Sequence, residues 1–261
     1  MNNVNKTLYI PLYGKSYVSR KGILLNDPKA EEIWSAEGFA LKGKSKSKWL
    51  AYFMAMRSAS FDCWLQKQMD ADPAAVVLHV GCGMDSRVLR VGTQGHMWFD
   101  VDFPEVIHQR KQYFQETDDY KMIPGDLRES EWLNRIPGGR AIVVLEGISM
   151  YLTPGELRQA FHNLYARFDK VQILMDCYTE FAAKASKYKN PINDVGVTQV
   201  YGLDDPNSLP GYVREHAMTP TDLIEQLQGM ERKIFMYLYA GSVAQKMYRL
   251  YEFSGGTVSK N

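Results

Sequence analysis

Residues Val76–Asp102 read VVLHVGCGMDSRVLRVGTQGHMWFDVD and carry the clearest structural pattern in the sequence. Val76–Val80 is uncharged and mostly apolar, which is typical of a strand buried on both faces. The turn that follows, Gly81-Cys82-Gly83, allows the backbone to approach a ligand without obstruction by side chains. We expect a helix over Met84–Val91, whose free N–H groups open onto that turn, and a second strand over His96–Phe99.

Two carboxylates, Asp100 and Asp102, follow the second predicted strand. Strand, glycine turn, helix, strand and acid form the layout of a nucleotide-type site, in which the acid accepts hydrogen bonds from ribose hydroxyls. A dinucleotide site needs a third small residue, G-x-G-x-x-G, but that place holds Ser86 followed by the long Arg87. The shorter turn suits S-adenosylmethionine, which has no phosphates. Taken by itself, the motif also fits a glycine turn that binds no ligand.

Four sequence motifs occur in a definite order, beginning at this turn: GCGMDSR, FDVDFPEVI, GDLR at Gly125–Arg128 and LEGISMYL at Leu145–Leu152. Together they resemble the leucine carboxyl methyltransferase family, including its bacterial relatives related to polyketide-synthesis O-methyltransferases. The resemblance runs from about Lys15 to about Phe168. It implies a Rossmann-like α/β fold of the class I methyltransferases, with a mostly parallel seven-stranded sheet, an antiparallel C-terminal strand pair and helices on both faces.

Composition excludes several classes of protein. The 261 residues carry a net charge of +1, which leaves no basic excess for nucleic acid. No apolar run approaches bilayer length, and MNNVNKTLYI lacks the profile of a signal peptide, so we expect no membrane association and a cytoplasmic location. The three cysteines are an odd number without metal-type spacing, which predicts reduced packing residues and no metal site.

The N-terminal part is predicted to cover the cofactor site. Asn2–Gly22 has no clear period, and we interpret it as an extended arm that contains Lys15. Asp27 is a plausible N-cap for a helix that ends near Glu37. Lys15 alone would be interpreted as a solvated lysine. The resemblance implies that it helps to hold the cofactor carboxylate, because the family keeps a lysine seven residues before the glycine that matches Gly22.

Ser47–Met69 has the clearest amphipathic helical pattern, and Arg57 interrupts its apolar stripe between Met54 and Phe61. A buried guanidinium needs an anion. That anion is either an internal carboxylate such as Asp62 or Asp85, or the carboxylate of the cofactor's methionine moiety, which guanidinium can bind through two hydrogen bonds. The resemblance favours the cofactor. In that case the guanidinium should be open to solvent when no cofactor is bound.

Further site residues follow the later strands. The resemblance assigns the ribose contact to Asp102, with Asp100 in an indirect role, and places Gly81 and Gly83 beside the cofactor. Asp126 and Leu127 follow a short strand at Lys121–Ile123, where they could contact the adenine amino group and the ring face; alternatively Asp126 caps a helix.

Ala141–Leu145 is another predicted buried strand, and Glu146 follows it. A carboxylate at that end of a central parallel strand should face the cofactor's ammonium or sulfonium group. Tyr151 lies five residues further on. We place it near the methyl acceptor, as the candidate catalytic residue. Thr153-Pro154-Gly155-Glu156 predicts a capped helix start.

We expect one methyltransferase domain over residues 1–261. It divides into an N-terminal arm and helices at 1–70, a cofactor-binding core at 76–176, a variable acceptor-side region at 178–230 and a C-terminal strand pair at 231–253. The two strands of that pair are predicted at Lys233–Tyr239 and Lys246–Phe253.

The function implied is an S-adenosylmethionine-dependent O-methyltransferase, with S-adenosylhomocysteine as product and a carboxylate or hydroxyl of a small molecule or peptide as acceptor. No His-Asp pair for general base catalysis is evident, which suits a carboxylate acceptor. The alternatives are an NAD(P)-dependent Rossmann oxidoreductase, a cofactor-binding protein without turnover and a purely structural domain. The sequence leaves the oligomeric state open.

Overall fold

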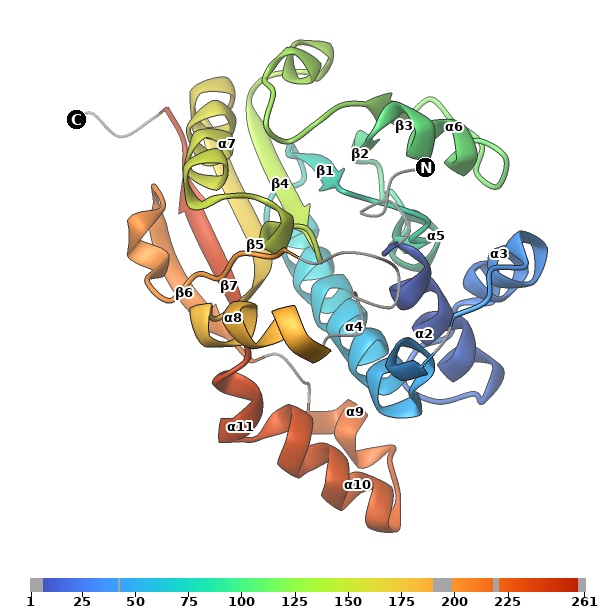
Figure 1. Ribbon diagram of the computed structural model, residues 1–261. Coiled ribbons are helices and arrows are strands. Elements are labelled where there is room, and N and C mark those ends of the chain that lie inside the picture. Colours follow the sequence, from blue (N-terminus) through green and yellow to red (C-terminus); the bar gives the residue numbers. More distant parts are fainter. Residues whose placement is uncertain (1–6, 42, 190–198, 218–220, 258–261) are drawn as a thin grey trace.

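The computed structural model describes residues 7–41, 43–189, 199–217 and 221–257. One seven-stranded sheet organises them, with the order β3-β2-β1-β4-β5-β7-β6 (Figure 1). Strands β1 to β5 are parallel, and β7 runs antiparallel to both β5 and β6. The strands are β1 Val76–Val80, β2 Trp98–Asp102, β3 Tyr120–Pro124, β4 Arg140–Leu145, β5 Lys170–Tyr178, β6 Tyr212–His216 and β7 Tyr248–Gly255. The predicted fold class, with its antiparallel C-terminal pair, is confirmed.

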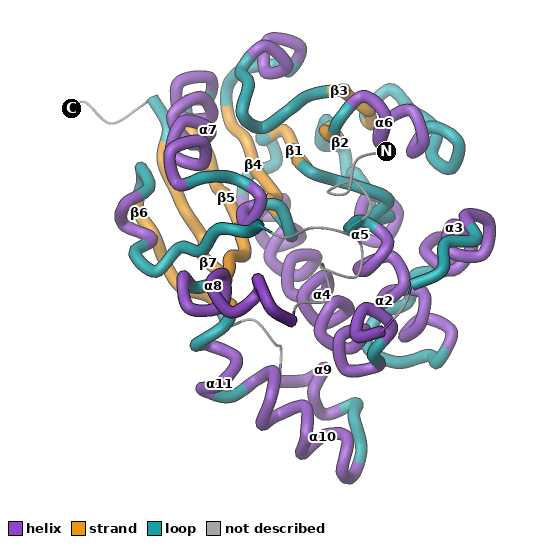
Figure 2. Tube along the Cα trace, in the orientation of Figure 1, coloured by secondary structure: helices purple, strands orange, loops and turns teal. Residues whose placement is uncertain are grey.

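Helices cover the sheet and extend beyond it (Figure 2). Those before the first strand are α2 Tyr9–Arg20, α3 Pro28–Glu37, η1 Gly43–Lys46 and α4 Lys48–Ala71. Those between the parallel strands are α5 Arg87–Val91, α6 Pro104–Arg110, η2 Glu131–Arg135, η3 Ser149–Tyr151 and α7 Pro154–Arg167. The remaining ones are α8 Glu180–Lys189, η5 Pro206–Ser208, α9 Thr221–Glu225, α10 Gly229–Phe235, the π-helical turn η6 Met236–Ala240 and α11 Ser242–Gln245.

The two faces of the sheet bury different side chains of the same strands. Val77 of β1 packs in the cluster that contains the α4 residues Phe61 and Leu65. Leu78 packs in a second cluster with Phe161 of α7. Because successive strand residues point to opposite faces, a strand covered on both sides must be apolar throughout, as Val76–Val80 is apart from His79.

The predicted long helix is confirmed as α4, but it is buried on more than one side. Every residue from Ala51 to Ser58 is buried. The reason is that α2 packs against α4 on the side away from the sheet, and the two helices form one of the most extensive contacts between elements of the described chain. The predicted caps also hold: Asp27 accepts a hydrogen bond from the Ala30 backbone N–H, and Thr153 forms a capping box with Glu156.

Several predicted boundaries are wrong. The described part of the predicted extended arm is largely the helix α2, held by buried side chains such as Leu12 and Val18. The helix predicted over Met84–Val91 begins only at Arg87, after an irregular turn. The second strand lies two to three residues later than predicted, so that Asp100 and Asp102 are within β2.

The C-terminal strand pair was predicted with the wrong first strand. Lys233–Tyr239 lies in α10 and η6, where Phe235 and Tyr239 stack with ring centroids 5.1 Å apart at the i, i+4 spacing of a helix. The strand that pairs with β7 in its place is β6, which comes earlier in the chain. The proposed unit 231–253 therefore holds only one strand of the pair.

Candidate active site

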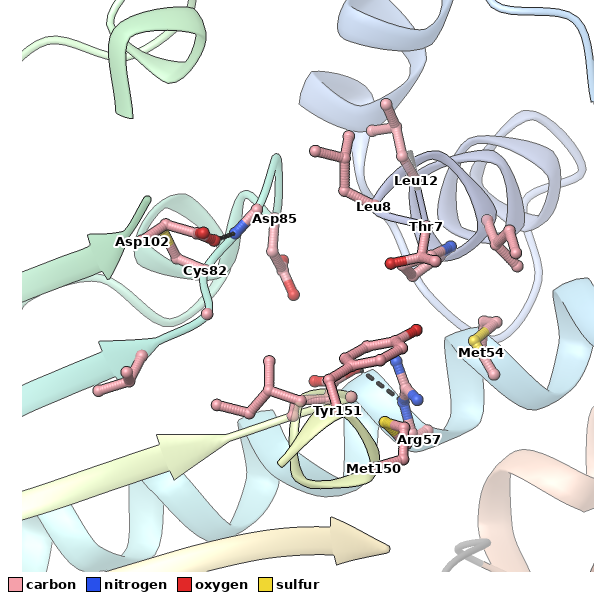
Figure 3. Close-up of a pocket in the computed structure, with 18 of the residues that line it drawn as sticks. Thr7, Leu8, Leu12, Met54, Arg57, Cys82, Asp85, Asp102, Met150 and Tyr151 are labelled. Atoms are coloured by element: carbon pink, nitrogen blue, oxygen red, sulfur yellow. Dashed lines mark hydrogen bonds and ion pairs between the residues drawn. The ribbon is translucent and has the colours of Figure 1, made fainter. Parts of the chain in front are cut away.

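A cavity of about 590 Å³ opens at the carboxyl ends of β1, β2 and β4. The strand order reverses between β1 and β4, which is the place where open α/β sheets bind ligands. Figure 3 shows Asp85 and Asp102 on one side of the cavity, with Thr7, Leu8 and Leu12 of the N-terminal segment across from them. The cavity wall has a polar half and an apolar half, and helix α4 contributes to both.

The polar half contains every site residue expected from the sequence: Lys15, Arg57, Gly81, Gly83, Asp102, Asp126, Leu127, Glu146 and Tyr151. The apolar half is formed by residues of α4, β5, η6 and β7 and their neighbours, among them Leu50, Phe53, Tyr178, Leu238, Tyr239 and Tyr248.

The glycine turn adopts a backbone conformation that favours glycine. Gly81 and Gly83 have φ angles of 69° and 50°. A Cβ atom at Gly81 would also lie 2.2 Å from Cγ2 of Ile148, so position 81 has no room for a side chain. The Gly83 N–H donates to Oδ2 of Asp102 over 2.7 Å, which ties the turn to the end of β2.

Asp102 and Asp100 lie on the same strand in different environments. Asp102 borders the cavity and accepts backbone hydrogen bonds from Gly83 and Phe103. Burial raises its pKa to about 6, although these two hydrogen bonds lower it. Asp100 is fully buried, and its carboxylate accepts hydrogen bonds from Arg110 and Tyr120. Burial opposes ionisation of Asp100, but Arg110 lowers its pKa to about 2. Only Asp102 faces the cavity.

Lys15 is not solvated. It is 2% exposed on α2, and its ammonium group lies 2.8 Å from Oδ2 of Asp85. Both residues border the cavity, so the helix that replaces the predicted arm places a cation next to the glycine turn. The pKa of Asp85 lies well below its usual value, because Arg90 and Lys15 outweigh the effect of burial.

Arg57 borders the cavity and also has internal partners. Its Nε atom donates to Glu146 over 2.9 Å, and its Nη1 atom lies 3.1 Å from Asp176 and 3.0 Å from the Tyr248 hydroxyl. The expected alternatives, Asp62 and Asp85, are not its partners. The expectation of a guanidinium open to solvent is wrong as well, since Arg57 is only 5% exposed.

Glu146 joins Arg57 to a larger buried cluster. It accepts hydrogen bonds from Arg57, Ser58 and Arg87. Burial alone raises the pKa of Glu146, but Arg87 and Arg57 lower it to about 2, so Glu146 is a carboxylate at neutral pH. The buried partners of Glu146, which the sequence did not identify, are therefore two arginines.

Arg87 and Arg90 on α5 complete this charged cluster, which we define as Lys15, Asp27, Arg57, Asp62, Asp85, Arg87, Arg90, Glu146 and Asp176. Arg87 is fully buried; its Nε atom donates to Asp62 over 2.6 Å, and its Nη1 atom lies 2.9 Å from Nε2 of His79. Arg90 lies 2.7 Å from Asp27 and 2.8 Å from Asp85. Their three-residue spacing on a short helix was the only sequence signal for this arrangement.

Asp126, Leu127 and Tyr151 complete the part of the wall that was expected from the sequence. Asp126 does not cap the following helix η2; it accepts hydrogen bonds from the backbone N–H and the Nε atom of Arg128. Leu127 is buried at the edge of the cavity. Tyr151 lies in η3, and burial raises the pKa of its hydroxyl while a hydrogen bond with Thr7 opposes that shift.

Two further polar residues beside the cavity were not identified from the sequence. The Tyr248 hydroxyl at the start of β7 donates to Oδ2 of Asp176 over 2.6 Å. Asp176 is fully buried in β5, and its Oδ1 atom accepts from the Gly147 backbone N–H over 2.6 Å. Residues 72 positions apart in the chain meet only because β5 and β7 pair.

These residues fit S-adenosylmethionine chemically. Asp102 can accept from ribose hydroxyls, because its two backbone donors leave lone pairs of a carboxylate free. The carboxylates that border the cavity, together with the guanidinium of Arg57 and the ammonium of Lys15, match a ligand that carries an ammonium, a sulfonium and a carboxylate. None of the described helices is both long and apolar enough to cross a bilayer.

Known proteins resemble the chain in sequence and in fold. A family model of leucine carboxyl methyltransferases matches residues 12–165. The tetracenomycin polyketide synthesis O-methyltransferase TcmP of Streptomyces glaucescens is 27% identical over 82% of this chain and 80% of its own length. The S-adenosyl-L-methionine-dependent methyltransferase dpfgK of Gibberella zeae is 24% identical, with the same coverage.

Among solved structures, a putative methyltransferase from Thermobifida fusca has a TM-score of 0.54 at 10% identity and covers 94% of both chains. Magnesium protoporphyrin IX methyltransferase from Synechocystis PCC 6803, solved with bound S-adenosylhomocysteine, has a TM-score of 0.50 at 11% identity and covers 93% of this chain and 100% of its own. These structures share the fold, whereas the family model covers more than half of the sequence. The chain therefore belongs to the leucine carboxyl methyltransferase family of S-adenosylmethionine-dependent enzymes.

Proposed function

We propose that the protein transfers the methyl group of S-adenosylmethionine to an oxygen atom of an apolar small molecule. The observation that carries this proposal is the division of one cavity into a charged half and an apolar half. The charged half suits the cofactor, and the apolar half, lined by Leu50, Phe53, Leu238 and Tyr239, suits an acceptor without many polar groups. The relative TcmP, whose name describes an O-methyltransferase of polyketide synthesis, supports an oxygen as the methylated atom.

In this proposal Asp102 holds the ribose, Leu127 and Asp126 contact the adenine, and Lys15 and Arg57 hold the carboxylate of the methionine moiety. Glu146 and Asp85 supply negative charge near the ammonium and sulfonium groups. The charged cluster fits this role because its four cations and five carboxylates sum to a net charge of −1, whereas the cofactor is a net cation.

When bound, S-adenosylmethionine supplies an electrophilic methyl group on a sulfonium. The protein must align the acceptor oxygen with that group and exclude water, and such alignment can contribute about 7–11 kcal/mol to lowering the barrier. Tyr151 in η3 borders the cavity near Arg57 and is proposed to position the acceptor (Figure 3).

The first test is ligand stabilisation. We expect S-adenosylhomocysteine to raise the melting temperature of the protein and NAD to leave it unchanged, because the glycine turn leads into Arg87 and the charged cluster without a site for a pyrophosphate. At a concentration 100 times its Kd the ligand should add about 2.7 kcal/mol of stability. Stabilisation by NAD alone would refute the proposal. A cofactor-binding protein without turnover would bind S-adenosylhomocysteine but methylate no member of a panel of hydroxyl and carboxyl compounds.

A second prediction concerns Asp102. If its carboxylate accepts from the ribose hydroxyls, the affinity for S-adenosylhomocysteine should fall as the pH is lowered through about 6, the raised pKa of Asp102 in the free protein. Asp102→Ala should remove this pH dependence and weaken binding by about 1.5–3 kcal/mol, roughly 10- to 150-fold. Calorimetric titration between pH 5 and 8 measures both effects.

Asp100→Ala is the matched comparison on the same strand. Since Asp100 pairs with Arg110 away from the cavity, its replacement should lower the free energy of unfolding more than the ligand affinity. A larger affinity loss for Asp100→Ala than for Asp102→Ala would transfer the ribose contact to Asp100.

A further inference from the structure

In the apolar half of the cavity, the Tyr248 hydroxyl is hydrogen-bonded to a buried carboxylate, that of Asp176. Its ring packs edge-to-face against Phe53 at 5.5 Å and against Tyr178 at 5.0 Å between centroids. Contacts on two sides fix the ring of Tyr248, which borders the cavity. Tyr248 lies outside the sequence motifs that resemble the family, and the cofactor assignment gives it no role.

The hydrogen bonds of this hydroxyl have a clear direction. It accepts from Nη1 of Arg57 over 3.0 Å and donates to Oδ2 of Asp176 over 2.6 Å. A phenolic oxygen has two lone pairs, so one acceptor position is left for a donor in the cavity. Such a donor would be a hydroxyl group of the methyl acceptor.

The two carboxylates beside Arg57 differ in their affinity for a proton. Burial raises the pKa of Asp176 in spite of Arg57, whereas Arg87 and Arg57 hold the pKa of Glu146 at about 2 against the effect of burial. Environments that separate the pKa values of neighbouring carboxylates are typical of acid–base sites. Asp176 is thus the better proton acceptor of the two, and Tyr248 connects it to the cavity.

Among the described residues that border the cavity, no lysine or arginine is left without a carboxylate partner to bind an acceptor carboxylate. The lysine and arginines that border the cavity in the described residues are Lys15, Arg57 and Arg128, and each already pairs with a carboxylate. In the proposed function, Lys15 and Arg57 also bind the carboxylate of the cofactor. Aromatic rings surround Tyr248 instead, which favours a planar, uncharged acceptor.

We propose that the methyl acceptor is an aromatic molecule with a neutral hydroxyl, and that Tyr248, backed by Asp176, takes up the hydroxyl proton. This inference rests on the proposed O-methyl transfer. The hydroxyl gives its proton to Oη of Tyr248, while Tyr248 gives its own proton to Oδ2 of Asp176. The acceptor oxygen uses an electron pair to form the O–CH3 bond, and the pair of the broken C–S bond remains on sulfur. Asp176 later returns the proton to solvent.

Binding to the protein loaded with S-adenosylhomocysteine tests the acceptor class with two probes that share a naphthalene ring substituted at the same position, 2-naphthol and 2-naphthoate. We expect 2-naphthol to bind and 2-naphthoate to bind at least tenfold more weakly. Tyr248→Phe should weaken the binding of 2-naphthol about tenfold. Its affinity for S-adenosylhomocysteine should stay within twofold of the wild-type value. Tyr251→Phe is the control, because Tyr251 is a buried tyrosine of the same strand that packs in the opposite cluster of the sheet.

Methylation of 2-naphthol tests the proton transfer. General base catalysis contributes about 10²–10⁴-fold, and Tyr248→Phe should lose a factor in this range at neutral pH. The loss should shrink as the pH is raised toward the pKa of 2-naphthol, because the ionised acceptor no longer needs a base. A tyrosine that only packs would give a loss independent of pH.

Three results would overturn the inference: tighter binding of 2-naphthoate than of 2-naphthol, binding of neither probe, or an unchanged 2-naphthol affinity in Tyr248→Phe. Each leaves the proposed function standing if the protein supplied with S-adenosylmethionine still methylates another oxygen acceptor. Failure to bind S-adenosylhomocysteine at all would instead refute the proposed function itself.

Discussion

Arg87→Met should lower the free energy of unfolding by about 3–5 kcal/mol, the cost of removing one partner from a buried ion pair. Arg87 is fully buried and contacts Asp62, Asp85 and Glu146. Methionine fills a similar volume, so the loss reflects carboxylates left without their partner more than a cavity. For a chain of this size the change corresponds to a melting temperature lower by roughly 6–20 °C. Urea unfolding at pH 7, followed by circular dichroism, measures it.

The loss of unfolding free energy in Arg87→Met should depend on pH. Because the pKa of Glu146 is about 2 in the folded protein and 4.5 ordinarily, its ion pairs contribute stability above pH 4.5 and lose it as the pH falls toward 2. The difference between wild type and variant should therefore shrink below pH 4.5. Arg214→Met is the control, since Arg214 is 61% exposed in its pair with Glu252 and should change stability by about 1 kcal/mol at most. Equal effects of the two substitutions would contradict the structural role of the charged cluster.

Arg57→Met should have two separable effects. Removing the guanidinium leaves Glu146 and Asp176 without a shared partner, so the protein without cofactor should lose about 3–5 kcal/mol of stability. The open site that the helix pattern suggested would instead have left stability nearly intact. Chemical unfolding in the absence of ligand distinguishes the two.

Ligand binding then tests whether Arg57 also holds the cofactor tail. Arg57→Lys keeps the positive charge and should preserve the fold, but it cannot bond Glu146, Asp176 and Tyr248 at the same time. The affinity for S-adenosylmethionine should drop by about 1.5–3 kcal/mol, roughly 10- to 150-fold. Binding of 5'-methylthioadenosine, which lacks the amino-acid tail, should remain within twofold. Equal weakening of both ligands would limit Arg57 to its internal contacts.

The first strand, the glycine turn and the position of Asp102 could be predicted because they are local features. Val76–Val80 is apolar at every position but one and is bounded by a glycine turn, which is typical of a strand covered on both faces. The turn needs glycine at positive φ, and the acid follows at the end of the next strand. Each of these features is written within about 25 consecutive residues.

Short apolar segments were less informative. Lys233–Tyr239 fits both a strand and a helix, and periodicity cannot separate the two over so few residues. Burial of Phe235 and its stacking on Tyr239 favour the helix. Conversely, Tyr212–His216 carries charged side chains at the sheet edge, as edge strands commonly do, and so lacked the apolar signal of the central strands.

The fold class, the family resemblance and a set of residues that border one cavity could all be inferred from the sequence. The tertiary structure alone decided which charges pair, because ion pairs such as Arg57 with Glu146 join residues 89 positions apart. It also brought Tyr248 to Arg57 across 191 positions. Charge pairing inside a protein depends on distance and burial, and neither is encoded in the local spacing of residues.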